Sequence, residues 1–142
     1  MKKLELLLVE DNQADIVLVR EALKASPVQV SLHVVNDGEE ALAFILRQEP
    51  YTQKAQPDLI LLDLNLPKKD GRAVLEAMHQ DPVLKSIPVA VLTSSSKTQD
   101  IIDSYSLGAN CYLQKPLELE EYLMLIQTLV DFWAQYVTLL PR

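Results

Sequence analysis

Cysteine is nearly missing from this sequence, since Cys111 is the single one among 142 residues. A lone thiol forms no disulfide within the chain, so a disulfide-based extracellular scaffold is excluded and a reducing compartment is favoured. Apolar runs long enough to span a membrane are also missing. The first residues, MKKLELLLVED, share some features with a signal peptide, but Glu5 and Glu10 interrupt an apolar run that is already too short. These absences predict a cytoplasmic protein.

Positive charge is scarce as well. Lysine and arginine number 13 against 20 acidic residues, and the formal net charge is -7. Nucleic-acid binding usually needs a basic stripe that neutralises phosphates, and the only dibasic pairs are Lys2-Lys3 and Lys68-Lys69. We therefore expect no nucleic-acid partner. Gly/Ser-rich linkers and internal repeats are absent too, which at this length indicates one domain.

The residues that are present alternate between short apolar runs and amphipathic segments. The predicted strands are 4–9, 28–35, 58–62, 87–93 and 109–114, and the predicted helices are 12–26, 37–48, 70–80, 97–106 and a long one from Glu118. Such alternation indicates parallel strands joined by crossover helices. The strands are continuous apolar runs, as expected when helices cover both sheet faces. The fold class predicted is α/β, a doubly wound five-stranded parallel sheet with five helices.

Polar side chains follow four of these predicted strands at their carboxyl ends, where ligands bind in doubly wound sheets. They are Glu10-Asp11, Asp63, Thr93-Ser94-Ser95 and Lys115-Pro116. Each group alone has an ordinary structural explanation, such as a helix N-terminal charge pair, a loop cap or a solvated lysine. The prediction of a site depends on all of them meeting at one edge of the sheet.

The chemistry of that edge favours a phosphoryl group. Three carboxylates repel one another unless a cation lies among them, and hard oxygen ligands without a His/Cys cluster suit Mg²⁺. Lys115 adds a positive charge and Thr93 a hydroxyl. Carboxylates, a divalent metal, a lysine and a hydroxyl together are typical of phosphoryl transfer.

Four segments also resemble the receiver domain of two-component response regulators, a flavodoxin-like fold. They are LLVEDN (7–12), LILLDLNLPKKDG (59–71), VAVLTSSS (89–96) and NCYLQKP (110–116). The resemblance extends over essentially the whole chain. The block LDLNLPKKDGR, residues 104–116 and the tail DFWAQYVTLLP (131–141) are similar to cyanobacterial phytochrome response regulators.

The resemblance implies a role for each residue of the site. Asp63 accepts a phosphoryl group from a histidine kinase of the phytochrome type. Asp11 binds Mg²⁺ directly, Glu10 acts through a bound water, and the backbone carbonyl of Asn65 completes the protein ligands. Glu10 departs from the pattern, because many receivers have aspartate there. The implied chemistry is Mg²⁺-dependent self-phosphorylation and autodephosphorylation only, so we expect no other enzyme activity.

The same resemblance implies a phosphate-binding and switching set. Thr93 and Lys115 bind phosphoryl oxygens, Ser94 leaves backbone room beside them, and Tyr112 changes rotamer on activation. The Lys115–Pro116 bond is implied to be cis, which proline permits at low cost.

Two positions suggest control of the reaction. Asn65 and Ser95 lie two residues after Asp63 and Thr93, so we hypothesise that they flank the path of water and set the dephosphorylation rate.

Val17 falls on the polar face of the first helix. It is either an ordinary exposed valine or a contact to the kinase.

The last helix carries more apolar residues than one stripe can bury. Leu119, Leu123, Ile126 and Val130 form the predicted core stripe. We expect a receiver domain over residues 1–130 and an extension of this helix over 131–142 that forms a homodimer. The predicted dimer surface is Phe132, Trp133, Tyr136, Val137 and Leu139. Alternatively, the tail folds back on its own domain.

Other functions fit less well. A dehalogenase-type phosphatase needs an aspartate where Asn65 stands, and no P-loop motif occurs. A receiver fold that acts as a phosphate-independent interaction module stays open. Because no residues follow 142, we expect no output domain and a signal that leaves by protein contacts.

Overall fold

The sheet has five parallel strands in the order β2-β1-β3-β4-β5. The computed structural model describes residues 3–141, so Lys2 and Arg142, which belong to predicted features, lie outside the described residues. The strands are β1 (Leu4–Val9), β2 (Val30–Val35), β3 (Leu59–Leu62), β4 (Val89–Thr93) and β5 (Cys111–Gln114). The predicted fold class is confirmed; β1 has the predicted bounds, and the other four strands begin one or two residues later than predicted.

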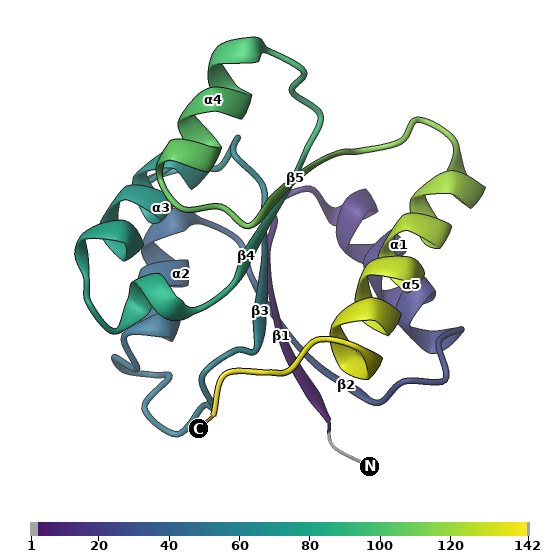
Figure 1. Cartoon of the computed structure of the whole chain (residues 1–142), viewed down its shortest axis with the longest axis horizontal. Coiled ribbons are helices and arrows are strands. Elements are labelled where there is room, and N and C mark those ends of the chain that lie inside the picture. The colour runs from purple at the N-terminus through teal and green to yellow at the C-terminus, as the bar shows by residue number, and fades with distance from the viewer. Residues whose placement is uncertain (1–2, 142) are drawn as a thin grey trace.

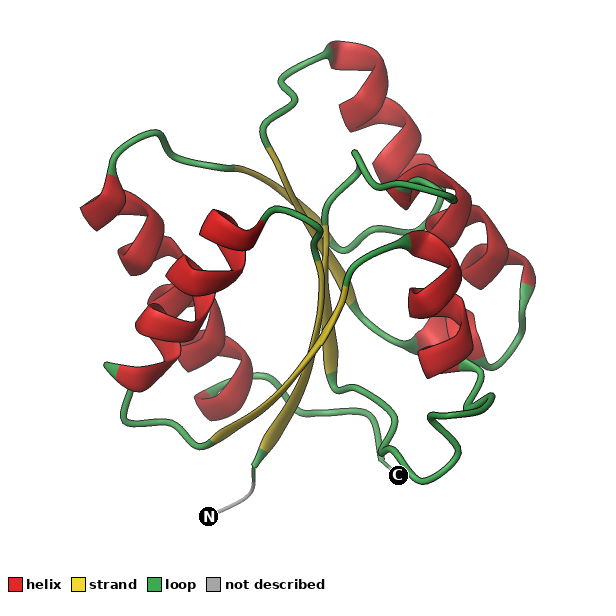
Figure 2. Ribbon diagram, turned by 180° about the vertical axis from the view of Figure 1, so that it is seen from behind, coloured by secondary structure: helices red, strands yellow, loops and turns green. Residues whose placement is uncertain are grey.

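Helices cover both faces of the sheet. They are α1 (Gln13–Lys24), α2 (Gly38–Ile45), α3 (Gly71–Gln80), α4 (Thr98–Ser106) and α5 (Leu119–Gln135), with a short 3-10 helix, η1 (Leu84–Ser86), before β4. Figures 1 and 2 show α1 and α5 on one side of the sheet and α2, α3 and α4 on the other. None of the helices within 3–141 is long and apolar enough to cross a bilayer.

Side-chain caps begin three of the helices. Asn12, Asp37 and Asp70 each accept a hydrogen bond from a backbone N–H three residues later. An accepted bond of this kind satisfies one of the N–H groups that the first helical turn leaves without a partner. Asn12 is therefore the N-cap of α1, at the first residue of the predicted helix 12–26.

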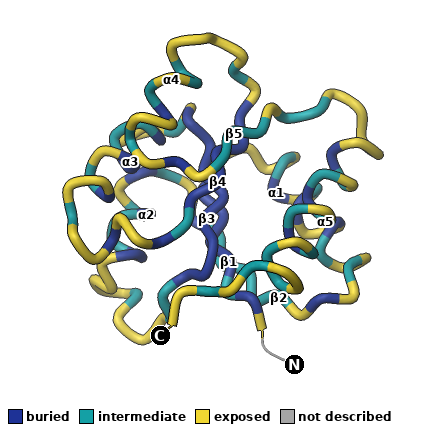
Figure 3. The backbone as a smooth tube through the Cα atoms, in the orientation of Figure 1, coloured by how far each residue is buried: buried dark blue, intermediate teal, exposed yellow. Residues whose placement is uncertain are grey.

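The core has two layers, one on each face of the sheet. Figure 3 shows the central strands in the buried colour, between helices that are largely exposed on their outer sides. In β3, Ile60 and Leu62 face the α2–α4 layer, while Leu59 and Leu61 face the α1–α5 layer, and all four are fully buried. Successive strand residues point to opposite faces, so a sheet buried on both sides needs an uninterrupted apolar run. This strand therefore delivers the next residue, Asp63, to the edge of a rigid scaffold.

The end of the chain differs from the expectation. Helix α5 ends at Gln135, and residues 136–141 leave it to run along the edge of the sheet where the strands begin (Figure 1). Predicting the extension of the helix to 142 was wrong. Trp133 and Leu139 pack against the α1–α5 core layer, whereas Phe132 and Tyr136 are exposed. The tail thus folds back in part on its own domain.

The predicted core stripe of this helix was wrong at its first position. Leu119 is 57% exposed, and the buried residues of α5 are Tyr122, Ile126 and Val130. A spacing of four residues keeps these three side chains on one face of the helix. Leu119 is the first residue of α5, before the buried residues of the helix begin.

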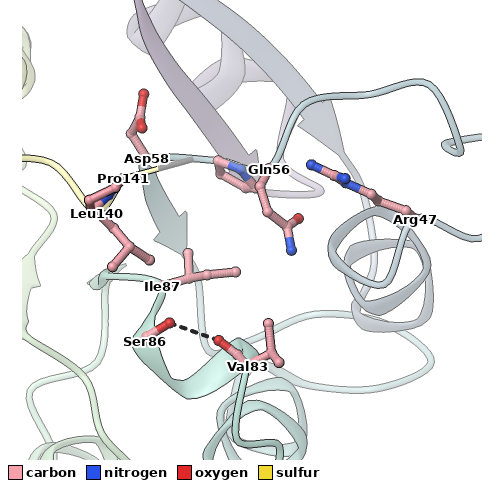
Figure 4. Close-up of a pocket in the computed structure, with 9 residues that line it drawn as sticks. Arg47, Gln56, Asp58, Val83, Ser86, Ile87, Leu140 and Pro141 are labelled. Carbon is pink, nitrogen blue, oxygen red and sulfur yellow. Dashed lines mark hydrogen bonds between the residues drawn. The ribbon is translucent and has the colours of Figure 1, made fainter.

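The tail also helps to enclose a cavity of about 220 Å³ at the edge where the strands begin, opposite the predicted site. Figure 4 shows Gln56 and Ile87 pointing into it, with Leu140 beside Ile87. Its lining residues are Arg47, Gln56, Pro57, Asp58, Val83, Ser86, Ile87, Leu140 and Pro141.

Candidate functional site

The strand order brings the predicted acidic residues together. The chain turns from β1 to β2 on one side and reaches β3 on the other, so the carboxyl ends of β1 and β3 meet at the topological switch point. Glu10 and Asp11 follow β1, and Asp63 follows β3. Glu10 and Asp63 are buried, at 2% and 7% exposure, whereas Asp11 is exposed.

Lys115 lies at the centre of this group. Its Nζ is 2.7 Å from Glu10 Oε1, 3.0 Å from Asp63 Oδ2 and 2.8 Å from Asp15 Oδ2, and its side chain is only 8% exposed. A buried ammonium retains its charge only when partners replace its hydration, and here three carboxylates do so. The predicted proximity of Lys115 to Asp63 is therefore confirmed.

Asp15 is the residue of this group that sequence reasoning missed. The sequence alone indicates only that an aspartate here is favourable in the first turn of a helix. The residue lies in the first turn of α1, which begins just after the acidic pair, and its carboxylate accepts from Lys115 Nζ. A third acidic residue at the start of the helix that follows Glu10 and Asp11 was the signal that could have identified it.

The electrostatics of the site differ from those of free side chains. Burial raises the pKa of the Glu10 carboxyl to about 7, although the hydrogen bond from Lys115 opposes this, and the nearby charge of Asp63 adds to it. Burial opposes the charge of Lys115, but its bonds to Asp15 and Glu10 outweigh burial and hold its pKa above the usual range. The site therefore has more negative charge than one lysine compensates.

A divalent cation fits this excess. Carboxylate oxygens of Glu10, Asp11 and Asp63 all lie within 4.8 Å of one another. An all-oxygen donor set with one exposed member leaves room for water ligands, as Mg²⁺ requires. The predicted acidic cluster is thus present in the folded chain, while the role of the Asn65 carbonyl stays a prediction.

Gly71, the first residue of α3, packs closely against the loop that follows β3. The N–H of Gly71 donates to the carbonyl of Leu64 at 2.9 Å, and a Cβ at Gly71 would lie 2.3 Å from the Asp63 carbonyl oxygen. No side chain fits at such a distance. Glycine at this position therefore allows α3 to begin directly against the backbone of Asp63 and Leu64.

The remaining predicted residues surround the opening of the site. Thr93 is fully buried at the end of β4, and its Oγ1 accepts from the Ser95 N–H at 3.4 Å. The Tyr112 hydroxyl donates to the Ser95 carbonyl at 2.9 Å, so the ring is turned inward. Asn65 and Ser94 line a hollow of about 390 Å³, together with Ser95, Ser96, Lys97 and Asp100. The Asn65 N–H also donates to Asp63 Oδ1 at 3.3 Å.

One prediction at the site was wrong. The cis peptide bond within 3–141 is Glu49–Pro50, so Lys115–Pro116 is trans. An X–Pro bond favours trans by about 0.5–1 kcal/mol unless its surroundings demand the other isomer. In the trans form the Lys115 side chain already reaches its three carboxylates, so the contacts described here are made without a cis bond.

Comparison with known proteins agrees with this geometry. The family model of the response regulator receiver domain matches residues 6–127. Response regulator Rcp1 of a Synechocystis species is 49% identical over 134 residues, which are 94% of this chain and 91% of that protein. The methanogenesis regulatory protein FilR2 of Methanothrix harundinacea, described as probable, is 36% identical over 90% of this chain and 82% of its own length.

Solved structures show the same relationship. The phosphorylated cyanobacterial phytochrome response regulator RcpA superposes with a TM-score of 0.94 at 45% identity, covering 99% of this chain and all of that one. The Mn²⁺-bound form of Rcp1 superposes with a TM-score of 0.91 at 48% identity, covering 96% and 99%. Since the family model spans most of the chain, and the acidic cluster, threonine and lysine meet at one sheet edge, this chain belongs to the response regulator receiver domain family and is homologous to the phytochrome response regulators.

Proposed function

We propose that Asp63 accepts a phosphoryl group from the phosphohistidine of a phytochrome-type histidine kinase in the cytoplasm. The observation that carries this proposal is the contact of the Lys115 ammonium with Asp63, at 3.0 Å, beside a cluster of three carboxylates. An aspartate is a weak nucleophile, so the site must act by alignment and charge compensation. The likeness to a phosphorylated phytochrome response regulator supports the same assignment.

The transfer step forms one bond and breaks one. A carboxylate oxygen of Asp63 attacks phosphorus, the P–N bond of the phosphohistidine breaks, and its electron pair stays on the imidazole nitrogen. Lys115 offsets charge on one phosphoryl oxygen, and the buried hydroxyl of Thr93 donates to another. Mg²⁺ held by Glu10, Asp11 and Asp63 would supply further charge compensation for the phosphoryl oxygens.

Intact mass after incubation with a small phosphodonor tests this function. We expect a gain of one phosphoryl group in the wild type with Mg²⁺, and no gain with chelator or in Asp63→Asn. Asp81→Asn is the matched control, because Asp81 lies at the far end of α3, and it should gain the phosphoryl group like the wild type. No gain in any sample would instead favour a phosphate-independent interaction module.

The surface of α1 is the proposed contact to the kinase. Val17 is 54% exposed, as predicted, and it lies on the same helix as the site residue Asp15. An apolar side chain on a helix next to the phosphoacceptor suits a helical phosphotransfer partner. Val17→Ser should slow transfer from a cognate kinase but leave phosphorylation by a small donor unchanged. Equal effects on both would mean that the substitution damages the site itself.

The end of α5 is the proposed homodimer surface. Phe132 and Tyr136 are 54% and 77% exposed, and their rings lie 6.2 Å apart, centre to centre. Exposed aromatic pairs are typical of interface anchors. Light scattering should show a dimer for the wild type and a monomer for Phe132→Ala with Tyr136→Ala. Val83→Ala, which removes another exposed apolar side chain, should remain a dimer.

A further inference from the structure

We propose that Asp100 and Arg72 are positioning residues that hold the Ser95 hydroxyl away from the phosphorylation site and so lengthen the lifetime of phosphorylated Asp63. This inference rests on the proposed function of Asp63. Ser95 lies two residues after the end of β4, and its hydroxyl is bonded to Asp100 of α4.

The Ser95 hydroxyl both donates and accepts a hydrogen bond. It donates its single proton to Asp100 Oδ2 at 2.5 Å, and its oxygen accepts from the Lys97 N–H at 3.3 Å. A hydroxyl has one proton to donate, so this side chain cannot donate to water in front of Asp63 at the same time. The bond to Asp100 therefore selects a rotamer that faces α4.

Asp100 is itself fixed. Its Oδ1 lies 2.5 Å from Arg72 Nη2, which extends from α3 and also lies 3.4 Å from Asp103 Oδ2. The hydrogen bond from Ser95 and the charge of Arg72 lower the pKa of the Asp100 carboxyl, although burial opposes them. Asp100 also lies in the first turn of α4, where a negative charge is favourable. The acceptor for Ser95 is thus ionised at neutral pH and held from two sides.

The backbone of Ser95 is held independently of its side chain. Its carbonyl accepts from the Tyr112 hydroxyl at 2.9 Å, and its N–H donates to Thr93 Oγ1 at 3.4 Å. Loss of Asp100 should therefore leave the backbone in place and release only the rotation about χ1. Ser95, Asp100 and Asn65 line a hollow of about 390 Å³, and the Asn65 N–H donates to Asp63 Oδ1 at 3.3 Å. The hollow therefore leaves space for the hydroxyl to turn from Asp100 toward Asn65 and Asp63.

A released hydroxyl would help hydrolysis. In that step a water oxygen attacks phosphorus, the bond from phosphorus to the Asp63 oxygen breaks, and its electron pair returns to the carboxylate. The protons of the water go to the phosphate product and to solvent. A serine hydroxyl turned away from Asp100, toward Asn65 and Asp63, can hydrogen-bond this water and orient it, and orientation accelerates the attack. Asp100 suppresses that contact in the structure described here.

The test is the half-life of the phosphoryl group after removal of the donor, with Mg²⁺ present. We expect Asp100→Ala to shorten it by about threefold or more, the scale of one oriented contact. Asp103→Ala is the matched control, since it removes the other carboxylate near Arg72 but no contact to Ser95, and it should keep the wild-type half-life. Arg72→Met should shorten the half-life by less, because Asp100 can still accept from Ser95.

A double-mutant comparison separates positioning from general damage. In a Ser95→Ala background, Asp100→Ala should change the half-life no further, because there is no hydroxyl left to release. A persistent effect in that background would overturn the inference, and so would equal half-lives for Asp100→Ala and Asp103→Ala. Failure of the wild type to take up phosphoryl at all would instead overturn the proposed function, and this inference with it.

Discussion

Glu10 should make the free energy of unfolding depend on pH in the metal-free protein. Its pKa is 4.5 in an unfolded chain and about 7 in the fold, chiefly because the carboxyl is buried. Between these values the folded state holds a proton that the unfolded state has released. Stability contributed by this group is therefore present below pH 4.5 and is lost as pH rises through 7.

The magnitude follows from the two values. Each pKa unit corresponds to about 1.4 kcal/mol. The difference between the folded and unfolded pKa of Glu10 therefore changes the free energy of unfolding by at most about 3 kcal/mol. Water at the open side of the site and the neighbouring Lys115 reduce this, and we expect about 2 kcal/mol between pH 5 and pH 8. The change that isolates the effect is Glu10→Gln, which cannot titrate but retains an acceptor for Lys115.

Urea unfolding with chelator, at a series of pH values, measures this directly. The free energy of unfolding of Glu10→Gln, minus that of the wild type, should rise as pH increases from about 4.5 to 7. The difference should be constant above about pH 8. Asp58→Asn is a useful comparison, because Asp58 is buried at 5% exposure but lies at the opposite edge of the sheet. Parallel curves for Glu10→Gln and the wild type would refute the argument that burial keeps this carboxyl protonated.

Three further substitutions test packing around the site and the tail. Gly71→Ala should destabilise the fold by about 2 kcal/mol or more and reduce phosphorylation, because its Cβ would meet the Asp63 carbonyl at 2.3 Å; thermal unfolding and mass gain measure the two effects. Ile126→Ala should lower the free energy of unfolding, measured in denaturant, by about 2–5 kcal/mol, because the side chain is fully buried. Met124→Ala, at a position 67% exposed, should change it by less than about 0.5 kcal/mol. Leu139→Ser should cost about 1 kcal/mol if the tail packs on the core as described, and an unchanged unfolding curve would contradict that packing.

Much of the fold was predictable because short local sequence patterns indicate where its helices and strands lie. The run LILL at 59–62 can be buried on both faces only in a central strand, and Asn12 or Asp37 before an amphipathic segment is a local start signal for a helix. The errors lay where local pattern is ambiguous. The sequence places apolar residues at both Leu119 and Tyr122, and only the position of α5 against α1 decides which of them is buried.

The candidate site divides in the same way. That Glu10, Asp11, Asp63, Thr93 and Lys115 lie at one edge follows from the sequence, because each stands at or just after a strand and parallel strands end at one edge. The folded chain was needed to show that Asp15 completes the contacts of Lys115, 100 residues away, and that Arg72 and Asp100 fix Ser95. These contacts depend on how helices are rotated and packed over the sheet. That is set by the sum of many side-chain contacts from distant segments and leaves no short pattern in the sequence.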